Sequence, residues 1–138
     1  MINGLCLIPE GRKKIKSQQD MKSEIYNVSS IIDLKNYLSY AEEHNLGVLY
    51  ISFQYGVSYA DDIVTKSRKS LFQLSRVQLK IWSKIIAEQV LRECLLHLVS
   101  EVHLMVKHET QYKFLIQEIQ YRGVKVFTPL LQSKDNEL

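Results

Sequence analysis

Residues 48–53 read Val48-Leu49-Tyr50-Ile51-Ser52-Phe53, and this stretch decides the fold class more than any other. It is short, rich in β-branched and aromatic residues, and almost continuously apolar. Such a pattern is typical of a strand in a parallel sheet whose two faces are both covered. We therefore expect an α/β fold in which helices lie on both sides of a buried strand.

Segments with helical periodicity alternate with further strand patterns on both sides of this stretch. Strands are expected at 24–28, 101–107 and 124–128, and helices at 29–45, 60–74, 76–99 and 109–121. This alternation predicts a small sheet of about four mostly parallel strands, with one long apolar helix near 76–99. The range 101–107 also fits a continuation of that helix.

Several residues mark the ends of the expected helices. Ser30 and Asp33 approximate a capping box at the start of the first helix. Gly47 is expected to end that helix in the left-handed conformation, and Gly123 to end the last one. Pro129 is expected to stop the final strand, because proline donates no backbone hydrogen bond.

The length of 138 residues corresponds to one ordinary domain. Apolar residues make up 46% and charged residues 24% of the chain, which is the range of globular proteins. We expect three parts: a basic, partly mobile N-terminal arm at 1–23, a single α/β domain at 24–131 and a polar tail at 132–138.

Cysteine usage and hydropathy bear on the cellular compartment. Cys6 and Cys94 form neither a disulfide framework nor a paired metal motif. The apolar start at 1–8 precedes its basic residues, whereas a signal peptide places its charges first. No apolar run approaches the roughly 18 to 20 residues of a membrane span. We expect an intracellular protein, cytoplasmic or nuclear, with no membrane partner.

Residues 63–87 contain six basic residues and no acid: Lys66, Arg68, Lys69, Arg76, Lys80 and Lys84. The last three are spaced by four, so on a helix they form one continuous stripe. Such a stripe can follow phosphates and gain affinity by releasing counterions. The alternative is an ordinary solvated helix face, because the net charge of the chain is only +3.

A second candidate site lies where the strand at 48–53 ends. In open parallel sheets, ligands bind outside the carboxyl ends of strands, and the following loop carries Tyr55, Tyr59, Asp61 and Asp62. Tyr59-Ala60-Asp61-Asp62 resembles the YADD signature of reverse transcriptases, whose aspartates bind two metals. The chain before residue 59 is shorter than the palm of those enzymes, so we expect both aspartates in the first turn of a helix, where negative charge is favourable.

Other groups of residues give only weak indications of a metal, catalytic or cofactor site. His97, Glu101, His103 and His108 lie within twelve residues, but a strand that begins near Glu101 would disperse them. We expect surface or edge positions for the histidines and no metal site. The chain also has no nucleophile elbow and no glycine-rich phosphate loop, so no cofactor is expected.

Three functional hypotheses remain open. The first is a small non-catalytic protein that associates with RNA, DNA or another polyanion and works in a complex. The second is a homodimer or protein-protein interaction module that uses the long apolar helix. The third is a small enzyme with an acidic site at Asp61 and Asp62, which is less favoured because no second catalytic group can be placed beside them.

Overall fold

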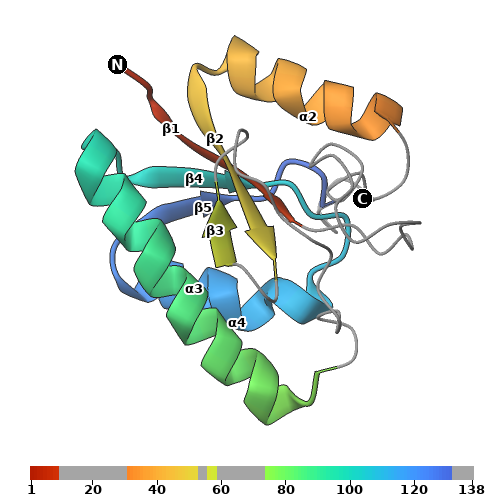
Figure 1. The fold of residues 1–138 in the computed structure, drawn as a ribbon, viewed down its shortest axis with the longest axis vertical. Coiled ribbons are helices and arrows are strands. Elements are labelled where there is room, and N and C mark those ends of the chain that lie inside the picture. Colours follow the sequence, from red (N-terminus) through yellow and green to blue (C-terminus); the bar gives the residue numbers. More distant parts are fainter. Residues whose placement is uncertain (10–30, 53–55, 59–73, 132–138) are drawn as a thin grey trace, which may run out of the picture.

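The protein folds as a five-stranded sheet with helices on both of its faces (Figure 1). This architecture comes from a computed structural model, which describes residues 1–9, 31–52, 56–58 and 74–131. The α/β class predicted from the sequence is confirmed. The stretch that decided it forms most of β2 (Leu46–Ser52), whose last four residues are all buried.

The strand order of the sheet is β3-β2-β1-β4-β5. The central strand β1 (Gly4–Pro9) pairs in parallel with β2 on one side and with β4 (Glu101–Leu104) on the other. Strand β5 (Lys125–Phe127) continues the parallel arrangement beyond β4. Strand β3 (Gly56–Ser58) pairs antiparallel with β2 and forms the opposite edge.

The N-terminal residues correct the expected domain boundaries. Residues 1–23 were expected to form an arm, yet Gly4–Pro9 is the central strand and all six of its residues are buried. The reason is that Leu5 and Cys6 point to opposite faces of the sheet, and each face has its own apolar core. The domain therefore includes the strand Gly4–Pro9. The rest of the expected arm, the expected strand at 24–28 and the tail at 132–138 lie outside the described residues.

A second correction concerns the segment after β2, which was expected to be a loop. Gly56–Ser58 returns alongside β2 as a short strand. The backbone N–H of Val57 donates to Oε1 of Gln89 at 2.9 Å, which attaches this edge to the helix that covers it. Gly56 has a φ of 65°, and a Cβ there would collide with the Gln89 side chain. Glycine is thus required for this close approach.

Three helices of the described residues cover the sheet. Helix α2 (Ile31–Glu43) packs on one face, while α3 (Arg76–His97) and α4 (Lys113–Tyr121) pack side by side on the other (Figure 1). The expected left-handed residue after α2 is Asn45, with a φ of 54°, and not Gly47, which lies in β2. Asparagine tolerates this conformation, and its Nδ2 donates to the Met1 carbonyl at 2.7 Å.

The remaining boundaries follow the sequence pattern closely. Residues 101–104 form strand β4, which resolves the ambiguity with a continuing helix in favour of the strand. A short 3-10 turn at Thr110–Tyr112 leads into α4. Gly123 follows α4 with a φ of 88°, as expected for a residue that ends a helix.

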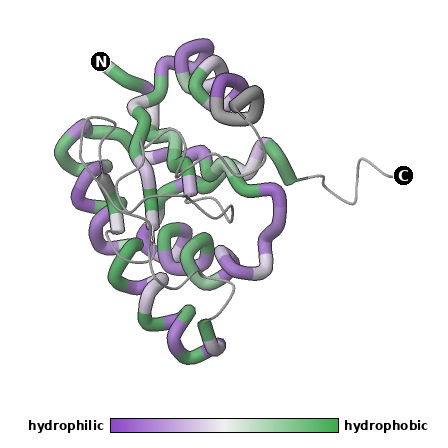
Figure 2. Tube along the Cα trace, turned by 45° about the vertical axis from the view of Figure 1, so that its right-hand side comes forward, coloured by the Kyte–Doolittle hydropathy of each residue, from purple (hydrophilic) through white to green (hydrophobic). Residues whose placement is uncertain are grey.

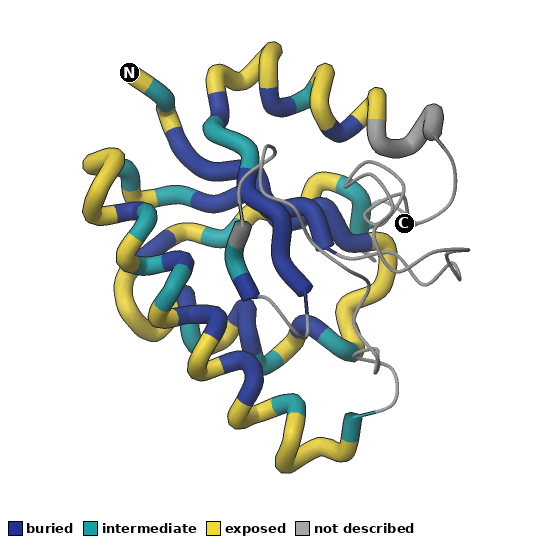
Figure 3. Tube along the Cα trace, in the orientation of Figure 1, coloured by how far each residue is buried: buried dark blue, intermediate teal, exposed yellow. Residues whose placement is uncertain are grey.

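Each face of the sheet has its own apolar core. The larger core lies beneath α3 and α4 and includes Leu7, Ile86 and Leu115. The smaller core lies beneath α2 and includes Cys6, Tyr37 and Met105. Hydrophobic and hydrophilic residues alternate along the coloured parts of the helices (Figure 2), and the buried positions on α3 face the sheet (Figure 3).

Candidate nucleic-acid interface

The start of α3 is fixed by a complete capping box. Oγ of Ser75 accepts a hydrogen bond from the Gln78 backbone N–H at 3.2 Å, and Oε1 of Gln78 accepts from the Ser75 N–H at 2.9 Å. Both bonds satisfy backbone donors that the first turn of a helix would otherwise leave unpaired. The cap therefore places Arg76 at the first helical position.

The orientation of α3 is set by its buried side. Trp82, Ile86, Val90 and Cys94 face the sheet, and the indole N–H of Trp82 donates to the Ser52 carbonyl of β2 at 3.3 Å. Because these residues recur at helical spacing, the opposite side of the helix must face the solvent.

The structure places three of the six predicted cations on exposed positions of this helix. Arg76, Lys80 and Lys84 follow one another at steps of four, as the sequence predicted for a stripe. None of them forms an ion pair with the part of the chain that the structure describes. The N-terminal half of α3 thus presents a row of unneutralised positive charge within that part.

An aromatic ring from α4 lies beneath two of these cations. Cζ of Arg76 is 5.6 Å and Nζ of Lys80 is 5.3 Å from the ring centroid of Phe114. Cations at this distance are attracted by the negative face of the ring. The ring therefore orders the two side chains, and sequence reasoning missed it because the contact joins α3 to α4.

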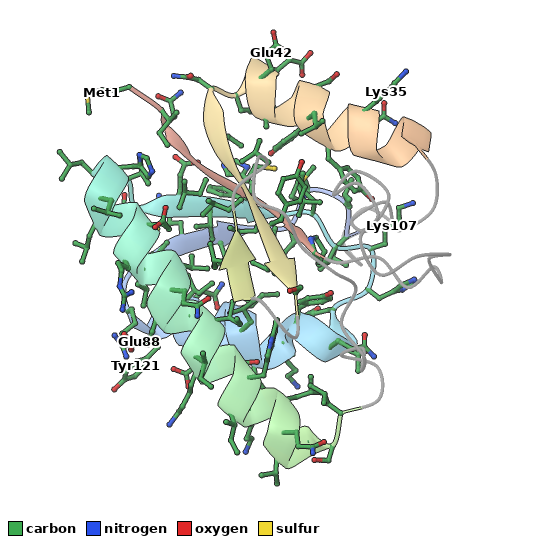
Figure 4. All side chains as sticks on the ribbon, in the orientation of Figure 1. Met1, Lys35, Glu42, Glu88, Lys107 and Tyr121 are labelled. Atoms are coloured by element: carbon green, nitrogen blue, oxygen red, sulfur yellow. The ribbon has the colours of Figure 1, made fainter. Side chains whose placement is uncertain are left out.

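Charge of both signs surrounds the C-terminal end of this row. An open groove of about 580 Å³ lies between α3 and α4 and is lined by Lys84, Ile85, Glu88, Glu118, Tyr121 and Arg122. Glu88 and Arg122 form an ion pair across it, and Glu88 and Tyr121 lie close to each other beside α3 (Figure 4). The positive surface is therefore concentrated at Arg76 and Lys80, with Lys84 at its boundary.

The other predicted site residues cannot be placed on this surface. Lys66, Arg68 and Lys69 lie outside the described residues, and so do Tyr55, Tyr59, Asp61 and Asp62. The chain winds outward in opposite directions from β1 and from β4, and open α/β sheets generally bind ligands at such a point in the strand order. The ligand site expected after the strand at 48–53 falls on residues outside the described part of the chain, so it stays a prediction.

A polar cluster that the sequence did not reveal lies on the opposite face, between α2 and β4. Nδ1 of His103 is 2.7 Å from the Tyr40 hydroxyl, and its Nε2 is 2.7 Å from Oε2 of Glu101. The ring of Phe127 stacks on the imidazole at 4.8 Å between centroids. His103 is buried, so the expected surface or edge position is wrong for this residue.

The hydrogen-bond chemistry of this cluster is self-contained. The tautomer of His103 with its hydrogen on Nε2 fits both contacts, because Nε2–H then donates to Oε2 of Glu101 and Nδ1 accepts from the Tyr40 hydroxyl. Burial raises the pKa of the Tyr40 hydroxyl above its usual value, with smaller contributions from Cys6 and Glu101, which keeps that hydroxyl protonated. The alternation of Glu101 and His103 along a strand puts both on one face, but Tyr40 lies 63 residues away and no local signal points to it.

The described residues contain no group of three metal-ligating side chains that could hold an ion. Among the described helices, none combines the length and apolar character that a membrane crossing requires. No known family model, curated protein or solved structure matches the chain.

Proposed function

We propose that this protein is a non-catalytic nucleic-acid-binding protein that contacts backbone phosphates with the N-terminal half of α3. One observation carries the proposal: Arg76, Lys80 and Lys84 are exposed in one row, without an acidic partner among the described residues. Cations arranged in this way bind phosphates by displacing condensed counterions. With such a ligand we expect the protein to work in the cytoplasm or nucleus, in a complex with RNA or DNA.

The electrostatics of the helix itself support an anionic ligand. The N-terminus of a helix carries a partial positive charge, which acids stabilise and cations destabilise. The first turn of α3 contains no acid and begins with Arg76. Within the described chain this arrangement is unfavourable, and a bound phosphate would offset it.

Phe114 favours a single-stranded ligand over a duplex. Its ring lies beneath the two basic side chains and is only partly buried. Unpaired bases stack on aromatic rings, whereas the bases of a duplex are already stacked on one another. Phosphates on Arg76 and Lys80 would bring a neighbouring base within reach of this ring.

Charge reversal on α3 tests the proposal. We expect Lys80→Glu combined with Lys84→Glu to weaken binding of a labelled single-stranded RNA at least tenfold at low salt, measured by fluorescence anisotropy. The matched control is Lys35→Glu with Lys125→Glu, two exposed lysines on α2 and β5. Lys35 lies on the far side of the molecule from α3 (Figure 4), so this control changes the net charge equally without touching the row.

Two results would contradict the proposal. The first is a wild-type protein that does not bind single-stranded RNA or DNA at low salt. The second is an equal loss of affinity in both double variants, which would assign binding to the overall charge of the protein. Competition by unlabelled duplex as strong as by single strand would remove only the role given to Phe114.

A further inference from the structure

The outer side of α3 carries more exposed apolar surface than a solvated helix usually does. Six large apolar side chains on it or at its C-terminal end are each more than half exposed: Val77, Ile81, Ile85, Leu95, Leu96 and Leu98. Exposed residues of this kind normally occur singly on a monomer, and contiguous patches mark interaction sites. The described residues leave this side of α3 uncovered, as the exposed positions along the helix show (Figure 3).

The spacing on this side is that of a helix-pairing seam. The seam consists of five residues, and the spacing between successive members is alternately four and three positions: Ile81, Ile85, Glu88, Arg92 and Leu95. This spacing keeps side chains on one narrow stripe, along which two helices can pack with interlocking side chains.

The order of residues along the seam is self-complementary in the antiparallel sense. When two copies are related by a two-fold axis at the level of Val90, Ile85 lies opposite Leu95 of the second copy. In the same arrangement Glu88 lies opposite Arg92. A parallel pair would instead place Glu88 against Glu88 and Arg92 against Arg92, which like-charge repulsion disfavours. Charge therefore selects the antiparallel orientation.

Both charged members of the seam have room for a further partner. The Glu88 side chain is 56% exposed even though it binds Arg122 of the same chain. Arg92 is exposed and makes no ion pair with the residues that the structure describes. A carboxylate can accept hydrogen bonds from two guanidinium groups, so Glu88 can hold both arginines.

The residue that ends α3 also supports pairing with a second copy. Leu98 has a φ of 55° and is 80% exposed, although a left-handed position favours glycine. Within the described chain its backbone is strained, and its side chain gains little burial. In the antiparallel arrangement Leu98 lies near the level of Ile81 of the second copy, where it would be covered.

From these observations we propose that the protein forms a two-fold symmetric dimer through antiparallel pairing of α3 with a second copy. Arg76 and Lys80 lie beside the seam rather than on it, so the proposed dimer leaves them accessible. The rise of an α-helix places the two Lys80 residues about 30 Å apart along the paired helices. A long single strand could then engage both basic rows of one dimer.

The oligomeric state without nucleic acid tests the dimer independently of the proposed function. We expect wild-type protein to sediment as a dimer at micromolar concentrations, and Ile85→Asp or Leu95→Asp to weaken the dimer at least tenfold. Both side chains are exposed, so the monomer fold should persist, as circular dichroism would report. Leu38→Asp replaces an exposed leucine on α2 and should leave the dimer intact.

Oxidative cross-linking tests the orientation of the two helices. We expect the double variant Ile85→Cys with Leu95→Cys to form a cross-linked dimer, and neither single variant to do so. Native Cys6 and Cys94 are buried and should not interfere. Cross-linking of the Ile85→Cys variant alone would indicate a parallel pair and overturn the arrangement.

Leu98→Gly should affect the stability of the monomer and the stability of the dimer in opposite directions. The substitution should raise the urea midpoint of the monomer, because glycine relieves the left-handed strain, and should weaken the dimer several-fold. A wild-type protein that sediments as a monomer up to submillimolar concentration would refute the dimer. So would a dimer that Ile85→Asp and Leu95→Asp leave unchanged.

Discussion

Ser83 brings a hydroxyl group into the apolar contact between α3 and the sheet. Its Oγ is fully buried and has no hydrogen-bond partner among the described residues. Removing such a group from water without a compensating bond destabilises the folded state.

Ser83→Ala should therefore stabilise the protein. We expect an increase of about 1 kcal/mol in the free energy of unfolding, measured by urea denaturation. Ser39→Ala on α2 is the control, because that serine is helical and exposed and reports the helix propensity of alanine alone. If Ser83→Ala raises the free energy of unfolding no more than Ser39→Ala does, the Ser83 hydroxyl has a hydrogen-bond partner in solution.

Because of its two buried cysteines, we expect the free energy of unfolding of the protein to fall at alkaline pH. Burial raises the pKa of Cys6 from 9.0 to about 12 and that of Cys94 from 9.0 to about 11. Both thiols are thus harder to ionise in the folded state than in the unfolded chain. Their contribution is fully present below pH 9 and is lost as the pH rises through the folded pKa values.

A pH series of urea denaturation checks this dependence. Between pH 9 and 11 we expect each thiol to lower the free energy of unfolding by about 1 kcal/mol per pH unit. Cys6→Ala should reduce this slope, although it lowers stability at neutral pH by leaving a cavity. An unchanged slope in that variant would show that the Cys6 thiol does not resist ionisation.

At the scale of elements, the cluster of Tyr40, His103 and Glu101 joins α2 to β4. Helix α2 is the one described helix on its face of the sheet, so this polar contact supplements a small apolar core. Gly4 of β1 makes the cluster possible. A Cβ at that position would lie 2.6 Å from Cγ of Glu101 and 2.8 Å from its backbone oxygen.

Tyr40→Phe should weaken the attachment of α2. The variant leaves Nδ1 of the buried His103 without its partner, so we expect a loss of about 1–2 kcal/mol in the free energy of unfolding. Tyr121→Phe is the matched control, because Tyr121 is 86% exposed and should tolerate the change. Equal stability of the two variants would show that the Tyr40 hydroxyl does not bind His103 in solution.

The sequence predicted those helices and strands that residues within the element itself specify. The continuous apolar run predicted β2, helical spacing predicted α3, and Gly123 marked the end of α4, whereas the Ser75 cap of α3 was not predicted. Strand β1 was missed because its apolar run is short and is followed by a basic stretch, which resembles an arm. Only pairing with β2 and β4 makes it the central strand, and pairing between distant segments leaves no local pattern.

For the candidate interface, too, the sequence predicted what lies within one helix and missed the contacts between helices. The spacing of Arg76, Lys80 and Lys84 predicted one exposed row, and the structure has that row on α3. The position of Phe114 beneath it depends on how α3 and α4 pack, which spacing within one helix does not specify. The cluster of Tyr40 and His103 was missed for the same reason.

At the scale of the whole molecule, the charge is modest and unevenly distributed. The net charge of +3 gives only weak attraction to nucleic acid over long distances. Binding must then come from local phosphate contacts, and the number of such contacts sets the salt dependence of the affinity. Salt dependence therefore separates a binding row on α3 from a general effect of charge.

The most direct test is the dependence of the dissociation constant for single-stranded RNA on salt concentration. For wild-type protein we predict a linear relation between the logarithms of the two. Lys80→Glu with Lys84→Glu should reduce its slope by about 1.4, at about 0.7 for each lost phosphate contact. The Lys35→Glu and Lys125→Glu control should keep the wild-type slope. Equal slopes in the two double variants would contradict a nucleic-acid interface on α3.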